Sequence, residues 1–169
     1  MTPSNNMTKI TDNIWLGDYS SSKNINNLKK ENIKKVLCLM NDNFPIYSKE
    51  DNINQKIIKV SDMPTANIIK HFGKSLSFID GKDNTLFHCM AGASRSATIV
   101  IAYIMWKEKM AYEDAFNFVN KKRPVAFPNF GFREQLKIFE NLLKDNNYDI
   151  NKIDFNNIKK HGKSIYFEW

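Results

Sequence analysis

Residues 86–100 read LFHCMAGASRSATIV, and this stretch decides the fold. Apolar residues lead into Cys89, a run of small residues follows, and Arg95 opens a long apolar segment. The pattern predicts a buried strand, a tight loop and the first turns of a buried helix. A loop that ends at a helix start turns backbone N–H groups and the positive end of the helix dipole toward one point. We therefore expect residues 89–95 to bind a tetrahedral anion.

Two side chains of this stretch carry chemistry. Arginine holds two phosphoryl oxygens with its planar fork and keeps its charge at physiological pH, so Arg95 suits a dianionic ligand. A cysteine at a helix start is commonly a thiolate, the form that attacks, which makes Cys89 a candidate nucleophile. The alternative is that Cys89 is an ordinary buried cysteine. The glycine in the loop and the spacing of six residues between Cys89 and Arg95 favour the nucleophile.

The string HCMAGASRSAT at residues 88–98 resembles the signature of the dual-specificity branch of the protein tyrosine phosphatases. Two further stretches are similar to the family, NIWLG at 13–17 and RPVAFPNFGF at 123–132, so the resemblance covers roughly residues 10–143. It implies an α/β fold with a central, mostly parallel sheet flanked by helices. It also implies a phosphoric monoester hydrolase that forms a phosphocysteine intermediate and needs no metal or other cofactor. No Cys/His cluster has the spacing of metal ligands.

The resemblance assigns roles to the residues of this loop. The phosphate-binding residues run from the cysteine to the arginine and are Cys89, Met90, Ala91, Gly92, Ala93, Ser94 and Arg95. Ser96 stands where the family carries a hydroxyl that helps the thiolate leave, and it can also stabilise the helix start. By the same resemblance His88 orders the loop through hydrogen bonds, and Asn129 ties the loop to the last helix.

Attack on a phosphate ester also needs an acid to protonate the leaving oxygen. Asp62 lies in a loop between an expected strand and an expected helix, where the family places its catalytic aspartate. Asp80 and Asp83 precede the strand that leads to Cys89, so they belong at the opposite end of the sheet. The alternative role for Asp62 is that of a turn or helix-start residue.

The rest of the chain predicts alternating strands and helices, as in an α/β sheet whose ligand lies beyond the carboxyl ends of its strands. We expect strands near 10–17, 33–40, 56–60 and 86–88, and helices near 20–31, 68–79, 96–109, 110–120 and 133–143. Residues 1–9 are predicted to be a mobile arm and residues 10–144 the catalytic domain. The polar tail, 145–169, is open to three interpretations: disorder, folding back over the core, or binding a partner.

Composition narrows the function less than the motif does. The net charge of +7 favours anionic partners, which include phosphorylated substrates, nucleic acid and membranes, but abundant lysine alone explains it. We expect Lys121, Lys122 and Arg123 to form a solvated helix end rather than a phosphate-attracting rim, and His71 and His161 to lie on the surface. Cys38 belongs to an apolar run and is expected in the core, with a redox role left open.

The expected substrate is a phosphoprotein. A chain this short has no room for the phosphotyrosine-recognition loop of the tyrosine-specific branch, which predicts a shallow pocket for phosphotyrosine and for phosphoserine or phosphothreonine. The uncharged residues Met90, Ala91 and Ala93 argue against phosphoinositides. The alternatives are a weakly catalytic phospho-binding module of the same fold, a phosphatase for a non-protein ester, or a rhodanese-like protein with the same cysteine-to-arginine spacing.

No apolar run approaches the roughly 20 residues that span a bilayer, and no secretory segment is evident. We therefore expect a monomeric signalling enzyme of the cytoplasm, with the nucleus as a second compartment and without a nucleic-acid partner.

Overall fold

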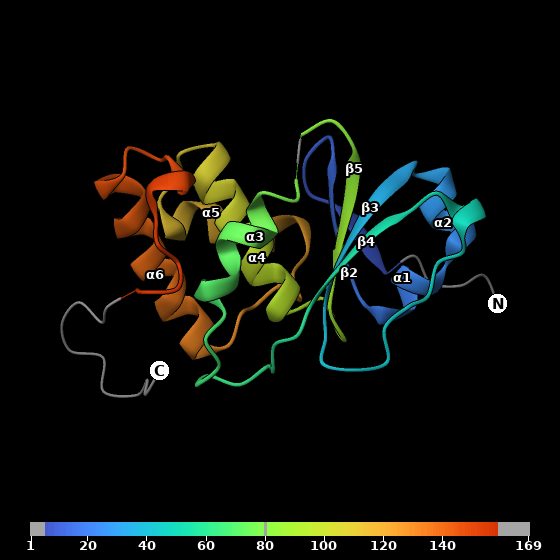
Figure 1. The fold of residues 1–169 in the computed structure, drawn as a ribbon, viewed down its shortest axis with the longest axis horizontal. Helices are drawn as coiled ribbons and strands as arrows, with labels where there is room; N and C mark the ends of the chain where they lie inside the picture. The colour runs from blue at the N-terminus through green and yellow to red at the C-terminus, as the bar shows by residue number, and fades with distance from the viewer. Residues whose placement is uncertain (1–5, 80, 159–169) are drawn as a thin grey trace.

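The computed structural model describes residues 6–79 and 81–158 (Figure 1). A five-stranded sheet with the order β1-β2-β5-β3-β4 forms its centre. Strands β2, β5, β3 and β4 are parallel, and only β1 runs antiparallel, at the edge beside β2. The expected α/β class with a mostly parallel sheet is confirmed. The strands are β1 (Met7–Lys9), β2 (Ile14–Gly17), β3 (Ile33–Leu39), β4 (Asn54–Ile58) and β5 (Asn84–His88).

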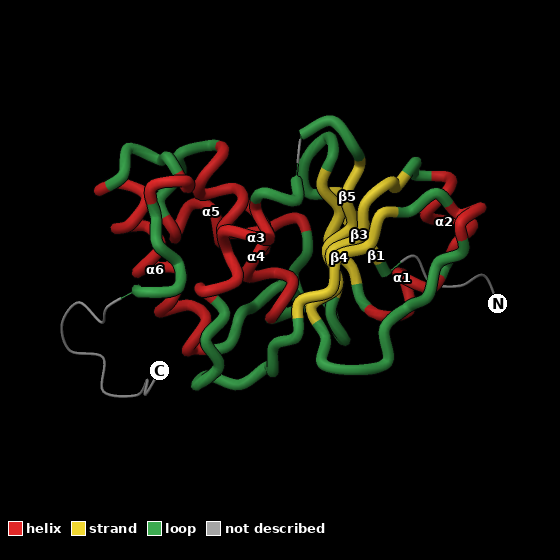
Figure 2. Tube along the Cα trace, viewed as in Figure 1, coloured by secondary structure: helices red, strands yellow, loops and turns green. Residues whose placement is uncertain are grey.

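Helices cover both faces of the sheet. Two short helices, α1 (Tyr19–Lys23) and α2 (Ile25–Lys30), lie on one side. The larger layer on the other side contains α3 (Phe72–Leu76), α4 (Arg95–Lys107), α5 (Tyr112–Lys122) and α6 (Phe130–Asp145). Figure 2 shows the sheet between these two layers. Three single 3-10 turns complete the elements: η1 (Lys49–Asp51), η2 (Ile69–His71) and η3 (Ile150–Lys152).

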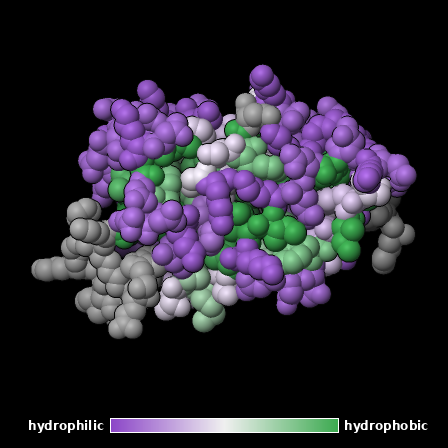
Figure 3. Space-filling model, in the orientation of Figure 1, coloured by the Kyte–Doolittle hydropathy of each residue, from purple (hydrophilic) through white to green (hydrophobic). Residues whose placement is uncertain are grey.

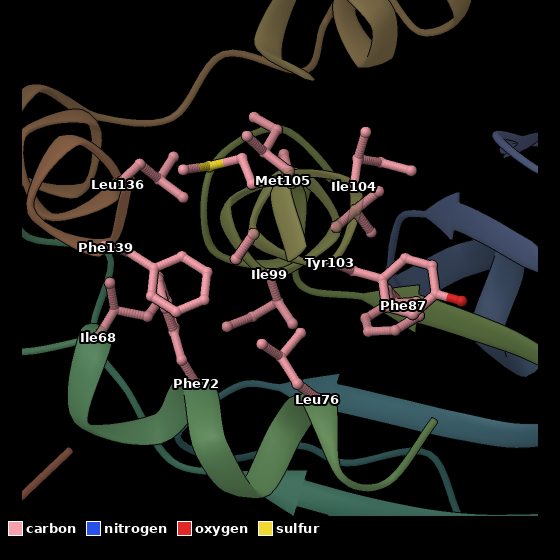
Figure 4. Packing of buried hydrophobic residues seen from close by; sticks show 14 of the residues in the cluster. Ile68, Phe72, Leu76, Phe87, Ile99, Tyr103, Ile104, Met105, Leu136 and Phe139 are labelled. Carbon is pink, nitrogen blue, oxygen red and sulfur yellow. The ribbon is translucent and has the colours of Figure 1, made fainter. Parts of the chain in front are cut away.

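The main core lies between the sheet and the larger helical layer. Helix α4 is apolar almost all round and buried along most of its length, as its sequence predicts. Phe72 of α3 and Phe139 of α6 meet edge to face, with ring centroids 5.0 Å apart, beside Ile99 of α4 (Figure 4). Hydrophilic side chains cover most of the face drawn in Figure 3, with apolar ones gathered near its middle.

Strand β5 is buried on both faces, as expected for a central parallel strand. Phe87 belongs to the main core, whereas Leu86 belongs to a smaller cluster under α2 on the opposite face. Because both faces are packed, the end of β5 is rigidly held. Cys89 follows at that end, beyond the carboxyl edge of the sheet.

The prediction of a mobile arm is wrong for Met7–Lys9, which form β1 and pair with Trp15–Gly17. Met7 is buried in the smaller cluster, and this burial stabilises an edge strand that the polar sequence around it does not suggest. Residues 1–5 of the expected arm lie outside the described residues.

Helix boundaries also differ from expectation. The single helix expected at 20–31 is divided at Asn24, whose side chain accepts a hydrogen bond from the N–H of Asn27 and so caps α2. The helix expected at 68–79 begins as the 3-10 turn η2 and continues as the short helix α3.

The start of the tail folds back over the helical layer. Ile150 and Ile153 are buried, Phe155 packs against Phe139, and Trp106 donates a hydrogen bond from its indole N–H to the Tyr148 carbonyl at 3.0 Å. Of the three interpretations of the tail, folding back therefore holds for residues 146–158. Residues 159–169, with His161, lie outside the described part.

His71 is not on the surface as expected but is buried beneath this segment, at 9% exposure. Burial, and to a smaller extent the nearby Lys74 and Lys70, lower the pKa of His71 to about 4. None of the described helices has both the length and the apolar character needed to cross a membrane.

Candidate active site

The loop between β5 and α4 is held open from outside by hydrogen bonds to its carbonyl groups. Each carbonyl from residue 90 to residue 94 accepts at least one. The donors are the N–H of Tyr19 to Met90 at 3.1 Å, Arg123 to Ala91 at 3.3 Å and to Gly92 at 3.0 Å, the N–H of Phe127 to Ala93 at 2.7 Å, and the N–H and hydroxyl of Thr98 to Ser94 at 2.9 and 2.8 Å. The carbonyls of residues 90–93 point to donors outside the loop, and the Ser94 carbonyl accepts the first bonds of α4, so the loop N–H groups remain available for an anion at the start of α4.

Gly92 lets the loop come close to β2. Its φ is +64°, in the left-handed region, and a Cβ there would lie 2.4 Å from the Gly17 carbonyl oxygen and 2.8 Å from Nη2 of Arg123. A side chain at this position is incompatible both with the backbone conformation and with the neighbouring backbone.

Cys89 lies at the base of the loop with 1% of its surface exposed. The hydroxyl of Ser96, in the first turn of α4, donates to Sγ of Cys89 at 3.1 Å. This is the contact needed to stabilise a thiolate as it forms or leaves. The structure thus brings together two of the residues expected to act in catalysis.

His88 is fully buried beside them, and its Nδ1 lies 3.4 Å from the Cys89 carbonyl oxygen. Burial lowers the pKa of His88 to about 4, so the ring is neutral at pH 7. A neutral ring in this place can fix the backbone beside the nucleophile. The resemblance gave His88 this loop-ordering role.

Asp62 comes to the site from the loop after β4. One carboxylate oxygen, Oδ1, accepts hydrogen bonds from the Ser94 hydroxyl at 2.7 Å and from Nδ2 of Asn129 at 2.8 Å. The other oxygen, Oδ2, lies 3.9 Å from Nε of Arg95. Asp62 is therefore tied directly to the phosphate-binding loop.

Asn129 joins three parts of the site. Its Oδ1 caps α6 by accepting from the N–H of Phe132 at 3.0 Å, its Nδ2 reaches Asp62, and its own N–H donates to the Ser94 hydroxyl at 3.1 Å. The geometry agrees with the expected tie between the loop and the last helix, and it adds Asp62 to that tie.

Arg95 extends from the first position of α4, and its side chain is 13% exposed. Nη1 lies 3.4 Å from the Val60 carbonyl oxygen, and Nε is buried with no hydrogen-bond partner among the described residues. The guanidinium therefore keeps unused donors next to the loop N–H groups, as an anion site requires.

The sequence prediction missed Arg123. It is buried, with 9% exposure, rather than part of a solvated helix end, whereas Lys121 and Lys122 are exposed as expected. Val119 and Ala115, one and two turns before Arg123 on α5, are buried, so the helical period already places Arg123 on the inner face. That periodicity is the sequence signal that could have found it.

Cys38 is buried in β3, in register with His88, and burial is the main reason that its pKa rises to about 12. It is a free thiol that stays neutral at pH 7, and its expected place in the core is confirmed. Asp83 lies beside Lys35 before β5, at the opposite end of the sheet from Cys89. In the described ranges, no group of three or more His, Cys, Asp or Glu side chains could hold a metal ion.

Comparison with known proteins agrees with this geometry. The family model for the dual specificity phosphatase catalytic domain matches residues 14–142. Dual specificity protein phosphatase 22 of Xenopus tropicalis is 34% identical over 139 residues, which cover 80% of this chain and 65% of that protein. The putative tyrosine phosphatase 123R of Invertebrate iridescent virus 6 is 36% identical over 146 residues, covering 83% of this chain and 96% of that protein.

Solved structures show the same architecture. The human tyrosine phosphatase-like serine/threonine/tyrosine-interacting protein superposes with a TM-score of 0.76 at 35% identity, over 82% of this chain and 97% of that chain. The chain spans about two thirds of the length of the Xenopus relative, so the shared part is the domain that contains the loop after β5.

Proposed function

Because the chain belongs to the dual specificity phosphatase family, we propose that it hydrolyses phosphate monoesters on proteins through a phosphocysteine intermediate. The observation that carries the proposal is the convergence of Cys89, Arg95 and Asp62 around one anion-binding loop. A binding module needs the loop and the arginine. It has no need of a buried thiol with a hydroxyl donor, or of a carboxyl group tied to the same loop.

In the first step, Sγ of Cys89 attacks phosphorus as the bond from phosphorus to the leaving oxygen breaks. Arg95 and the loop N–H groups bind the three remaining oxygens, where negative charge is held in the transition state. Protonated Asp62 gives its proton to the leaving oxygen. Since Ser94 and Asn129 both donate to Oδ1, the transferable proton belongs on Oδ2.

In the second step, water attacks the phosphocysteine. Asp62, now a carboxylate, accepts a proton from that water as the sulfur–phosphorus bond breaks. The Ser96 hydroxyl, 3.1 Å from Sγ, stabilises the departing thiolate by a hydrogen bond. Inorganic phosphate leaves, and both Cys89 and Asp62 return to their starting states.

The surroundings of the loop support a protein substrate. Apolar side chains close in sequence to the site are about half exposed: Met63 beside Asp62, Met90 beside Cys89, and Phe127 and Phe130 on either side of Asn129. An exposed apolar surface next to an anion site suits a phosphorylated side chain on a polypeptide, including the ring of phosphotyrosine. We propose that it accepts phosphotyrosine as well as phosphoserine and phosphothreonine.

The same proposal covers the cellular setting. The chain acts as a monomeric signalling phosphatase on phosphoproteins in the cytoplasm or the nucleus, without nucleic acid as a partner. The kinship with named protein phosphatases supports a phosphoprotein as the substrate.

The decisive experiment compares hydrolysis of an aryl phosphate by the wild type and by Cys89→Ser, with Cys38→Ala as the control that removes the other thiol. We expect Cys89→Ser to lose activity by about a thousandfold or more. Acid quenching of the wild type during turnover should trap phosphate on Cys89. Equal rates for wild type and Cys89→Ser would remove the enzyme claim and leave a binding module.

A substrate panel then tests the specificity. Phosphopeptides that carry Tyr, Thr or Ser are compared with soluble phosphoinositides. Faster phosphate release from the inositides would contradict the protein-substrate proposal.

A further inference from the structure

Arg123 connects the back of the catalytic loop to the N-terminal strand. It follows α5 in sequence, yet its guanidinium bonds to residues far from it along the chain. Nε and Nη2 donate to the carbonyls of Gly92 and Ala91 at 3.0 and 3.3 Å. Nη1 donates to the Asn6 carbonyl at 3.1 Å and to the Thr8 hydroxyl at 3.2 Å. One side chain thus links two segments that lie far apart in the sequence, the loop after β5 and the N-terminal residues 6–8.

The partners of Arg123 are unusual for a buried arginine. Buried charges are normally paired with an opposite charge. Among residues 6–79 and 81–158, every hydrogen-bond partner of Arg123 is a neutral oxygen, and no carboxylate lies within ion-pair distance. A charge placed this way is costly to bury. Burial lowers the pKa of the Arg123 guanidinium, and the Asp18 carboxylate, which lies beyond ion-pair distance, offsets part of this effect.

The two loop carbonyls that Arg123 holds are the ones most able to turn. The Ala91 carbonyl belongs to the peptide unit before Gly92 and the Gly92 carbonyl to the one after it, and glycine moves between left- and right-handed conformations with little penalty. If either carbonyl turned inward, it would direct a negative dipole end at the phosphoryl oxygens and withdraw an N–H donor. The guanidinium opposes both rotations with charge-assisted hydrogen bonds.

We infer that Arg123 is a positioning residue that keeps the catalytic loop in its anion-binding shape and makes that shape depend on strand β1. The inference rests on the proposed function only for turnover, because anion binding by the loop can be measured without catalysis. It assigns to residues 6–8 a part in the active site, although they precede the family-model match at 14–142.

The test uses the full chain with Arg123→Lys and Arg123→Met, and Lys121→Met as the control that removes an exposed cation two residues away. Binding of tungstate and of inorganic phosphate is measured by calorimetry, together with the rate at which iodoacetamide alkylates Cys89. We expect both Arg123 variants to bind these anions at least tenfold more weakly and Lys121→Met to bind them as the wild type does. Lysine keeps the charge but cannot reach both loop carbonyls and the Asn6 carbonyl at once.

Rescue separates positioning from general damage to the fold. Added guanidinium ion, at concentrations too low to unfold the chain, should restore part of the anion affinity of Arg123→Met and leave the wild type unchanged. If Arg123→Met does not fold, Arg123→Lys decides, with its thermal unfolding measured alongside. Wild-type anion affinity in a folded Arg123→Lys would overturn the inference.

A double-mutant cycle tests the dependence on β1. Thr8→Val removes the hydroxyl that accepts from Arg123 while keeping a β-branched residue in the strand. We expect a several-fold loss of anion affinity in the wild-type background and none in the Arg123→Lys background, since the two residues act through one bridge. Equal losses in both backgrounds would show that β1 acts independently of Arg123.

If the wild type binds tungstate but has no turnover, the proposed function fails while this inference stands. If the variants lose turnover but keep full anion affinity, the inference about Arg123 fails while the proposed function stands.

Discussion

The shape of the catalytic loop depends on a glycine at residue 92. Two separate constraints exclude a side chain there: the left-handed φ of +64° and the Gly17 carbonyl oxygen, 2.4 Å from where a Cβ would lie. Gly81 offers the comparison, because its φ is +74° and a Cβ would meet nothing within 4 Å. Both glycines thus have a positive φ, but only at Gly92 would a side chain collide with neighbouring backbone.

We predict that Gly92→Ala weakens phosphate binding and turnover by at least tenfold and lowers the free energy of unfolding by about 1–3 kcal/mol. Gly81→Ala should lower it by about 1 kcal/mol and leave activity unchanged. Calorimetric phosphate titration and chemical denaturation measure the two effects. Similar losses of activity in both variants would contradict a role for the contact with Gly17.

The candidate site residues that the sequence predicted share one property: they are chemically reactive or charged residue types at positions fixed by a motif or by an expected element. Cys89, Arg95 and Ser96 follow from one short motif, and Asp62 from its place after a strand. Arg123 could not be assigned the same way, because three of its four partners are backbone carbonyls, which are the same in every residue type, and the fourth is the hydroxyl of distant Thr8. Ser94 was assigned only to phosphate binding, and its hydrogen bonds to Asp62 and Asn129 came from the fold.

At the scale of elements, helix α6 holds the segment that follows the loop of Asp62, the proposed acid. Gln135 is fully buried, and its Oε1 accepts from the N–H groups of Ile68 and Ile69 at 2.9 and 3.0 Å. Its Nε2 donates to the carbonyls of Ala66 and Gly131. The N–H groups at the start of η2 therefore find an acceptor on a different helix, in addition to the local bond from the Ile68 N–H to the Ala66 carbonyl at 3.1 Å.

We predict that Gln135→Leu lowers the free energy of unfolding by about 1–3 kcal/mol, because it leaves the buried N–H of Ile69 without a partner and removes one of the two acceptors of the Ile68 N–H. It should also lower kcat more than phosphate affinity, since the acid loop loosens while the loop after β5 stays in place. Asn141→Leu, an exposed amide on the same helix, is the control and should change neither. Denaturant titration and steady-state kinetics provide the readouts, and an unchanged kcat in Gln135→Leu would show that α6 does not position the acid.

The elements that periodicity predicted well are the ones whose burial is continuous, above all β3, β5 and α4. The helix expected at 68–79 was misjudged because its first turn depends on Gln135, which lies more than sixty residues away. Strand β1 was missed for a related reason. The three residues of β1 have polar neighbours in the sequence, and they form a strand because Met7 packs into the cluster that contains Trp15.

At the scale of the whole molecule, the described residues include two buried histidines that resist protonation. The pKa values of His71 and His88 are both lowered to about 4, mainly by burial, whereas an unfolded histidine titrates near its ordinary value of 6.5. Between these values the unfolded chain binds protons that the folded chain does not. The contribution of the two neutral rings to stability is therefore complete above about pH 6.5 and is lost as the pH falls toward 4.

We predict that the free energy of unfolding decreases steeply from pH 6.5 to pH 4. In His71→Gln the slope of this decrease near pH 5 should correspond to about one fewer proton taken up on unfolding. Urea denaturation at a series of pH values gives the slope. Thr2→Gln, a substitution far from both histidines in sequence, is the control. A slope unchanged by His71→Gln would mean that His71 is protonated in the folded chain.

Fold class and family were predictable because one motif and the strand–helix alternation agree with each other over most of the chain. Net charge contributed nothing, since a charge of +7 fits several kinds of partner. The folding back of residues 146–158 was one of three open interpretations, because sparse apolar residues such as Ile150 and Phe155 do not specify which surface they cover.

The outward hydrogen bonds of the catalytic loop also bear on the newly made chain. Arg123 reaches Gly92 across 31 residues and Asn6 across 117 residues, so the anion site exists only after the first and last parts of the domain have met. During synthesis Cys89 leaves the ribosome before Arg123 does, so the loop that follows it still lacks the hydrogen bonds from Arg123. Under the proposed function, a nascent or partly unfolded chain therefore has no phosphatase activity until the fold is complete.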